Sequence, residues 1–419
     1  MEGKLRPWID MTSLKAHNPL IKGRTVVVIP LLLALIGLAA FMVQLSGTHP
    51  DRAWQSYLIN FLLWSAVAQG GLLFSTVTHI TKARWSKPLQ DIADSFVAFF
   101  PLSLGLFLLL FLGRESLFPW LHHELHGKES WLNIPFLFSR DLIGLLVLYG
   151  LGLAYVYYAL RLRLGSTPEK GKLVALFLRN WTGSEPEQRI CHGRMNVLAV
   201  LYILAYTLVL TLIAFDLMMS MEPHWFSTLF GPYYFVKAFY IGLGALITLA
   251  AIISLVRGED SGLTPSHFHD IGKLFFAFCL LWADFFYAQL LVIWYGNISE
   301  ETTFVITRTV FLPWKHLAWT VFIVSFVVPF LVLLNRPVKS KPIPMIILCI
   351  VVFIGIWLEH LLLLGPALSP QATSLPLGLA DVLITLGFLG LLIFSVSLFL
   401  RIFPIPNREI EPGPQQEVG

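Results

Sequence analysis

The sequence predicts an all-α membrane protein that crosses the bilayer ten times, and three observations predict it. Of the 419 residues, 56% are hydrophobic and only 13% are charged, whereas a soluble protein carries about 25% charged residues. Ten apolar stretches are each long enough to cross a hydrocarbon core of about 30 Å. Most basic residues fall in every second connection between these stretches, and therefore on one side of the membrane, as the positive-inside rule requires.

The predicted spans follow one another along residues 24–402, between a basic arm at 1–23 and a Pro-rich polar arm at 403–419. No cleavable signal is expected, because the first 23 residues are polar and basic. In order, the spans cover residues 24–45, 53–79, 92–112, 140–162, 194–216, 233–256, 273–295, 314–334, 343–364 and 377–399.

The basic residues predict the orientation. With a cytoplasmic N-terminus, 22 of the 29 Lys and Arg residues fall in cytoplasmic segments or at cytoplasmic span ends. An even number of crossings then places both termini in the cytoplasm. We therefore expect a multi-pass protein of the bacterial cytoplasmic membrane, with the loop at 113–139 outside and the loop at 165–193 inside.

The most unusual stretch is residues 273–302, which predicts one crossing helix with an acid near its middle. Asp284 lies about 16 Å along that helix from Lys273. A charge at this depth costs at least about 2.5–3.5 kcal/mol, so such residues usually face a protein interior or a wet cavity. Tyr287 lies three residues later and shares the face of Asp284. Proton transfer, binding of a polar ligand, and a protonated Asp that only packs are the open interpretations.

Further titratable groups in and beside the later spans predict a proton path that descends from the outer face to Asp284. Asp, Glu, His and Tyr can both accept and donate a proton, and a buried Lys can do so when its pKa falls. Structural alternatives are interfacial snorkelling for Lys237 and helix capping for Asp381. Besides Asp284 and Tyr287, the candidates are Asp216, Glu222, His224, Lys237, Tyr240, Glu359, His360 and Asp381.

No cofactor or metal is expected on this chain. Cys191, Cys279 and Cys349 are far apart and form neither CxxC nor CxxCH, so a haem c attachment or an iron–sulfur cluster is unsupported. The histidines at 122, 123 and 126 lack a further ligand at fixed spacing. His360 is the one clear intramembrane His, and a b-type haem needs two.

Several segments together resemble the ActF family, membrane subunits of Alternative Complex III. They are DLMMSMEPHWFSTLFGPYY (216–234), WADFFYAQLLVIWYGNISEETTF (282–304), VVPFLVLLNRPVK (327–339) and GFLGLLIF (387–394), followed by PIPNREIEP. Two positions depart from the family pattern, which has an aromatic at Asp284 and a Pro at Ser299. The matching polar and aromatic positions are Asp216, Glu222, His224, Trp225, Gln289, Tyr295, Asn297, Glu300 and Glu301.

The resemblance implies an NrfD-like fold, with two four-helix bundles from spans 2–5 and 6–9 flanked by spans 1 and 10. Residues 53–162 would then supply most of the first bundle, and residues 194–364 mostly the second, with span 5 joining the first. It also implies a respiratory or photosynthetic quinol:electron-acceptor oxidoreductase complex. The partners would be an NrfD-like ActC subunit, an iron–sulfur subunit, and multihaem and monohaem cytochrome c subunits, which carry the redox groups.

Two functions stay open under this resemblance. In the first, the chain has no catalytic residue and contributes a proton path coupled to quinol oxidation. In the second, the chain itself binds quinone, with Glu222, His224, Trp225 and Tyr233 as an aromatic-lined site containing a proton acceptor. A stand-alone secondary transporter is the weakest alternative, because no span near Asp284 is visibly broken by Gly or Pro.

Overall fold

The computed structural model describes residues 25–122, 125, 127–165 and 172–405. Within this part, ten helical segments are long and apolar enough to cross a membrane, which confirms the predicted number. They are α2 (Thr25–Leu45), α3 (Pro50–Ile80), a broken segment from Arg84 to Leu117, α7 (Ile134–Leu164), α9 (Glu185–Leu217) with a short extension, α10 (Phe230–Arg257) with another, α11 (Pro265–Gly296), a second broken segment from Trp314 to Leu334, α16 (Pro342–Leu368) and α17 (Leu379–Ile402). The N-terminal arm and most of the C-terminal arm lie outside the described residues.

Two spans predicted as continuous are interrupted. The third consists of α4 (Lys87–Ala93), η2 (Asp94–Phe99), α5 (Phe100–Leu110), η3 (Phe111–Gly113) and α6 (Arg114–Leu117), after the turn η1 (Arg84–Ser86). Pro101 has no N–H for the carbonyl of Val97, which accepts instead from Phe100 in a tighter turn. The eighth span consists of α13 (Trp314–Phe322), the π-helical turn η7 (Ile323–Val327) and α14 (Val328–Leu334).

Short elements connect the spans. They are η4 (Pro119–His122), α8 (Lys172–Phe177), η5 (Met219–Met221), η6 (Gly258–Ser261), α12 (Ser299–Thr309) and α15 (Arg336–Lys339). The crossing helices also run beyond several predicted ends. α10 begins three residues before the predicted span, and α16 ends four residues after it.

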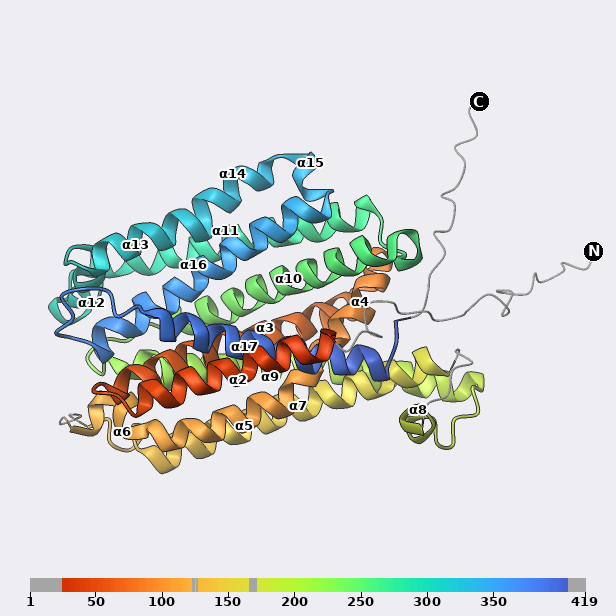
Figure 1. The fold of residues 1–419 in the computed structure, drawn as a ribbon, viewed down its shortest axis with the longest axis horizontal. Coiled ribbons are helices and arrows are strands. Elements are labelled where there is room, and N and C mark those ends of the chain that lie inside the picture. The colour runs from red at the N-terminus through yellow and green to blue at the C-terminus, as the bar shows by residue number, and fades with distance from the viewer. Residues whose placement is uncertain (1–24, 123–124, 126, 166–171, 406–419) are drawn as a thin grey trace, which may run out of the picture.

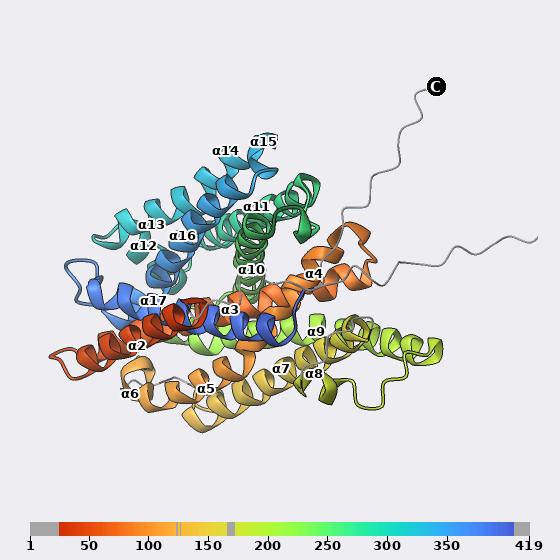
Figure 2. The same cartoon turned by 45° about the vertical axis from the view of Figure 1, so that its right-hand side comes forward.

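The helices pack around a central pair, α3 and α10. α5, α7 and α9 lie on one side of this pair, and α11, α13, α14 and α16 lie on the other (Figures 1 and 2). α2 packs along α17, and both cover α3. The most apolar window of α3 is completely buried, whereas that of α11 is 17% buried, so α3 forms the centre and α11 lies at the periphery.

Glycines allow the central helices to touch backbone to backbone. A Cβ on Gly242 of α10 would lie 2.7 Å from the Cα of Gly70 on α3, and a Cβ on Gly387 of α17 would lie 2.7 Å from the Cα of Gly37 on α2. Small residues drive helix association in membranes, because lipid offers no hydrophobic gain between apolar surfaces and close contact supplies the attraction.

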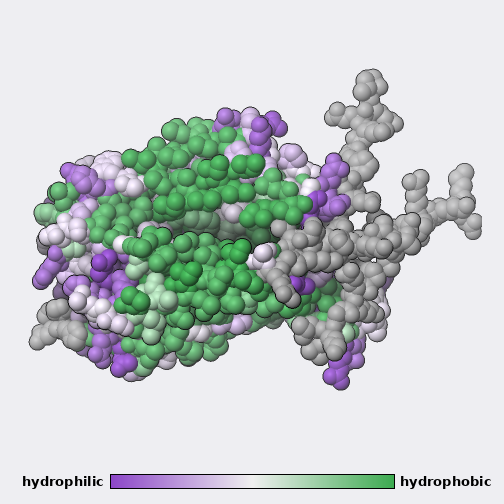
Figure 3. Space-filling model, in the orientation of Figure 1, coloured by the Kyte–Doolittle hydropathy of each residue, from purple (hydrophilic) through white to green (hydrophobic). Residues whose placement is uncertain are grey.

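The surface fits a membrane. Figure 3 shows a broad hydrophobic band over the middle of the visible face, with hydrophilic residues gathered toward both ends of the long axis. Large apolar side chains such as Val43, Leu112, Leu208 and Leu379 are more than two-thirds exposed. The described chain is therefore a multi-pass membrane protein.

The glycine contact makes a testable prediction about the centre of the fold. Gly242→Val should destabilise the protein by about 3 kcal/mol, the upper part of the usual range for overpacking, because the added atoms meet backbone. The measurement is thermal unfolding of the purified chain in detergent. Gly150→Val on α7 is the matched control, since a Cβ there meets nothing within 4 Å. Equal loss of stability in both variants would contradict the assigned contact.

Candidate functional site

α10 and α16 bring four titratable side chains together in the interior of the membrane region. Tyr233 and Lys237 are four residues apart and share a face of α10. Lys237 Nζ lies 3.2 Å from Glu359 Oε1, and the Tyr233 hydroxyl donates to the same oxygen. His360 follows Glu359 on α16. Lys237, Glu359 and His360 are at most 1% exposed. We call these four residues the Lys237–Glu359 cluster.

The cluster lies well inside its two helices. Lys237 is seven residues after the first residue of α10, Phe230, and Glu359 is nine residues before the last residue of α16, Leu368. At about 1.5 Å per residue, these positions lie about 10 and 13 Å inside their helices. The interpretation that Lys237 snorkels to the interface is wrong, because its side chain is buried and pairs with Glu359.

The charges of the cluster depend on each other. A single buried charge would lose its hydration without compensation, whereas an ion pair with further hydrogen bonds recovers much of that cost. Lys237 Nζ also lies over the Tyr233 and Tyr234 rings, 5.1 and 5.2 Å from their centroids. Glu359 Oε1 therefore accepts two hydrogen bonds, while Glu359 Oε2 has no partner among the described residues.

His360 has a defined tautomer. Its Nδ1 lies 2.8 Å from the carbonyl oxygen of Ile356, and a carbonyl can only accept, so Nδ1 carries the hydrogen. In the neutral ring Nε2 is then an acceptor. This Nε2 is buried and has no partner within the described chain, so the ring can accept a hydrogen bond on that side.

Tyr240 extends the polar groups inward, one turn beyond Lys237. Its hydroxyl donates to the backbone carbonyl of Ser325, 3.4 Å away. This carbonyl is available because Pro329, four residues later, has no N–H to donate, and the chain widens into η7. π-turns inside helices occur often at functional sites. The interruption that the sequence analysis did not find thus supplies a polar group to the middle of the bundle.

A second group of charges lies where α7 begins and α9 ends. Arg140 makes a two-pronged contact with Asp216, at 2.5 and 2.6 Å, and the Trp131 indole N–H donates to the same carboxylate at 3.2 Å. Asp141 is fully buried and interacts with the Asp216 carboxyl. The sequence analysis found Asp216 and missed Asp141, whose position next to Arg140 was the available signal.

Glu222 pairs with a buried arginine from the connection after α11. Arg308 Nη2 lies 2.6 Å from Glu222 and 2.8 Å from the carbonyl oxygen of Leu363, one turn of α16 beyond Glu359. Burial lowers the pKa of the Arg308 guanidinium, and the negative charge of Glu222 opposes that shift. Arg308 therefore connects Glu222 with the helix that carries the cluster.

The four residues predicted as a quinone site do not share one slot. Trp225 is buried and stacks on Phe304, with ring centroids 3.7 Å apart. His224 is exposed. Glu222 pairs with Arg308, and the Tyr233 hydroxyl donates a hydrogen bond to Glu359. The expectation fails because the aromatic residues pack on each other, and Phe230 fills the space between Trp225 and Tyr233.

Asp284 and Tyr287 lie on the outer surface of α11. Both side chains are exposed, Tyr287 by 59%, while Cys279, Trp282 and Ile293 form the buried face of this helix. The expectation that Asp284 faces a protein interior is wrong for this chain. The predicted proton path that ends at Asp284 is therefore wrong as well. Hydropathy gives the depth of a residue, and packing decides which side of the helix is covered.

The remaining predicted residues either make local hydrogen bonds or lie at the periphery of the structure. Asp381 accepts from the Gly378 N–H at 2.7 Å and from the Ser56 hydroxyl, so the capping interpretation is confirmed. Gln289 donates to its own helix at Phe285. The other positions of the resemblance lie around the α11–α12 junction and are exposed or half-buried: Tyr295, Asn297, Glu300 and Glu301.

The sequence analysis also missed a hydrogen-bonded chain in the first half. The Ser65 and Ser103 hydroxyls lie 2.7 Å apart, and Ser103 lies 2.7 Å from the Tyr149 hydroxyl, which accepts from Gln69. All four are buried. Single hydroxyls in apolar spans gave no signal of this convergence, because they come from α3, α5 and α7.

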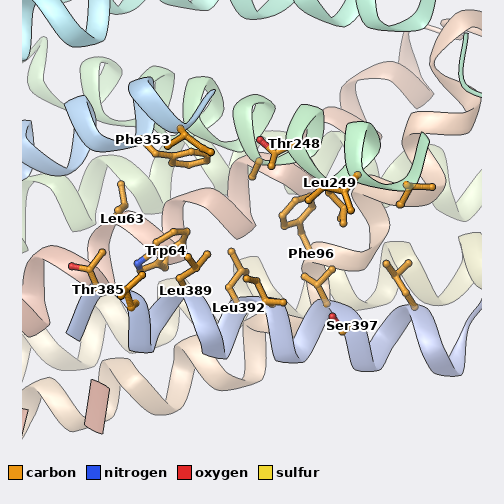
Figure 4. Close-up of a pocket in the computed structure, with 18 of the residues that line it drawn as sticks. Leu63, Trp64, Phe96, Thr248, Leu249, Phe353, Thr385, Leu389, Leu392 and Ser397 are labelled. Carbon is orange, nitrogen blue, oxygen red and sulfur yellow. The ribbon is translucent and has the colours of Figure 1, made fainter. Parts of the chain in front are cut away.

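An apolar cavity of about 740 Å³ lies between α17, α10, α16 and α3 (Figure 4). Figure 3 shows the corresponding hollow on the hydrophobic face. Leu63, Phe353 and Leu389 line it, and Thr248, Thr385 and Ser397 are among its few polar groups. None of the four predicted quinone residues lines this cavity. Trp357 does, and its indole N–H has no partner in the described chain.

The fold and the cluster define a polytopic α-helical membrane protein with ionisable groups in its interior. Among the described residues, no three His, Cys, Asp or Glu side chains are grouped as a metal site would require. Comparison with known protein families finds no family model that matches the chain, and comparison with curated proteins finds no match.

The buried ion pair predicts a strong dependence of each charge on the other. Lys237→Met should destabilise the protein by about 3–5 kcal/mol, because Glu359 is left buried and uncompensated. Adding Glu359→Gln should restore most of the loss. Thermal unfolding in detergent of both single variants and the double variant measures the coupling. Arg189→Met is the control, since its pair with Glu185 is exposed and contributes about 0.5 kcal/mol or less. Additive effects of the two substitutions would contradict the pairing.

Proposed function

We propose that this chain is a membrane subunit of a quinol-oxidising complex of the Alternative Complex III type, and that it carries protons from the outer face to the middle of the bilayer. The observation that carries the proton path is the Lys237–Glu359 cluster. Ionisable residues are expensive inside a membrane, and those that persist usually mark proton relays or ligand sites. The assignment to this complex is supported by the four segments that resemble the ActF family.

The path uses groups in contact or one turn apart. Glu222 and Arg308 lie at its outer end, and Arg308 binds the α16 backbone at Leu363, about 6 Å of helix rise from Glu359. Glu359 and Lys237 exchange the proton in the middle, next to Tyr233. Tyr240 and the Ser325 carbonyl form the inner end of the described contacts.

Buried polar atoms without a hydrogen-bond partner are the positions where water molecules would connect the groups of this path. Glu359 Oε2, His360 Nε2 and Ser325 Oγ are buried without a partner among the described residues. Buried polar groups in proteins are nearly always bound to protein or to ordered water. Water at these atoms would join carboxylate, imidazole and hydroxyl, all of which accept and donate protons.

The proposal includes the finer architecture. Both termini lie in the cytoplasm of a bacterium, spans 2–5 and 6–9 form the two four-helix bundles, and partner subunits hold the haem c groups and iron–sulfur clusters. The packing of α5, α7 and α9 on one side of the α3–α10 pair, and of α11, α13, α14 and α16 on the other, supports the two bundles. The excess of Lys and Arg on one side supports the orientation.

The proposed path predicts a coupling defect. The complex is purified through a tag on this chain, examined for c-type haem, and reconstituted into vesicles. Glu359→Gln should lower the number of protons moved per electron, because an amide cannot take up and release a proton. The measurement compares external acidification with reduction of the electron acceptor.

Glu185→Gln, on an exposed side chain, is the control and should retain the wild-type ratio. A wild-type ratio in Glu359→Gln would remove the cluster from proton transfer. A purified chain without c-type haem or quinol oxidation would remove the complex assignment and leave the ion pair as a structural feature.

A quinone-binding role is the second candidate, and the apolar cavity favours it. Its volume lies within the usual range for small-molecule sites, about 300–1,000 Å³. Ile350, Ile354 and Val382 on its lining are exposed, so a molecule can enter from the lipid. The Trp357 indole N–H offers a donor to a quinone carbonyl. The Thr248 and Thr385 hydroxyls donate to helix carbonyls, which leaves them as acceptors for a quinol.

This alternative predicts an effect of filling the cavity. Leu389→Trp should reduce the quinone that copurifies with the chain, because the larger ring occupies the space where the molecule binds. Organic extraction followed by chromatography measures the quinone per protein. Leu398→Trp on the same helix is the control, since Leu398 is exposed and does not line the cavity. Equal quinone in both variants would remove the cavity as its site.

A further inference from the structure

The exposed face of α11 carries a carboxyl group in the middle of the membrane. Asp284 lies 12 residues before the last residue of the helix, Gly296, about 18 Å from that end. Residues three, four and seven positions away share its face. With Asp284, four such neighbours form an exposed stripe, which Lys273 extends toward the start of the helix: Ala277, Leu280, Leu281 and Tyr287.

The described part of the chain offers no counter-charge to this carboxyl. No ion pair or hydrogen bond within the described residues involves Asp284. The cation of the stripe, Lys273, lies 11 residues away, about 16 Å along the helix, and binds Asp270 at 2.8 Å. Lys237 is buried on α10 and paired with Glu359. A carboxyl group that faces lipid at this depth lacks both water and a donor, so the isolated chain leaves it unsatisfied.

We infer that this stripe is the docking surface for a transmembrane helix of a different membrane protein, which places a Lys or Arg side chain at the depth of Asp284. A buried cation would satisfy the carboxylate and fix the depth of the partner helix. Ala277, two helical turns before Asp284, lets a helix approach closely, as small residues do in membrane helix pairs. Leu280, Leu281 and Tyr287 supply the surrounding packing surface.

The chemistry of the stripe disfavours the other occupants. Two copies of this chain in one membrane associate about an axis along the membrane normal, which brings equal residues to equal depth. Two Asp284 carboxylates would then face each other without a cation. An anionic lipid headgroup carries the wrong sign, and headgroups lie about 15 Å from the middle of the bilayer.

The inference needs only that the chain spans a membrane, and it depends neither on the proton path nor on the complex assignment. Its test uses the full-length chain in nanodiscs of neutral lipid. The probes are two fluorescent Leu/Ala transmembrane peptides, one with a central Lys and one with Leu at that position. Energy transfer from the labelled chain to each peptide measures binding. The Lys peptide should bind about tenfold more tightly, as expected for an interhelical polar pair.

Asp284→Leu should abolish the preference for the Lys peptide. Leu204→Ala, on the exposed surface of α9 and away from the stripe, should retain it and shows that a variant with another altered lipid-facing residue still folds and binds. Equal binding of the two peptides to the wild-type chain, no binding of either, or a preference that survives Asp284→Leu would each overturn the inference. A wild-type dimer in the nanodiscs that Asp284→Leu converts to a monomer would assign the stripe to a second copy and overturn it as well.

Discussion

Hydrocarbon offers no hydrogen bonds, and this constraint shapes the interior of the protein more than any single contact. Every polar group that enters the membrane region must find its partner on another helix, in its own backbone or in enclosed water. The Lys237–Glu359 pair shows the most demanding case. Two charges at most 1% exposed compensate each other at 3.2 Å, and Tyr233 adds a hydrogen bond. Because neither charge is tolerable alone, the pair also fixes how α10 and α16 face each other.

The same constraint explains why the central helices are so close. α3 is surrounded on all sides, and Gly70 and Gly242 let its backbone touch that of α10. This contact holds the two halves together without any gain from removing water, so attraction must come from dense packing. The hydrogen-bonded chain of α3, α5 and α7 lies on one side of this contact. The charged cluster of α10 and α16 lies on the other side. The interior polar groups therefore depend on a contact that contains no polar side chain.

The sequence predicted the parts of the fold that depend on one helix at a time. The ten spans follow from length and hydropathy, and the depth of Asp284 follows from its distance to Lys273. Contacts between helices were not predictable in this way. Asp141 escaped attention because the nearby carboxyl of Asp216 comes from another helix, and the role of Pro329 appears only where Tyr240 reaches the freed carbonyl of Ser325.

Asp284 and Glu359 show how far depth alone can mislead. Each is an acid well inside a crossing helix, and hydropathy treats them alike. Glu359 meets Lys237 because α16 turns that face toward α10, whereas α11 turns Asp284 outward, opposite Trp282. The cost of a carboxylate in lipid is the same at both positions. The two residues therefore differ in which group supplies the counter-charge or hydrogen bond. An acid in the interior finds its hydrogen-bond donors within its own chain and can take part in proton transfer. An acid on the outer surface at that depth needs a donor from another protein. We therefore propose different roles for two residues of the same chemistry, proton transfer within the chain for Glu359 and recognition of a partner helix for Asp284.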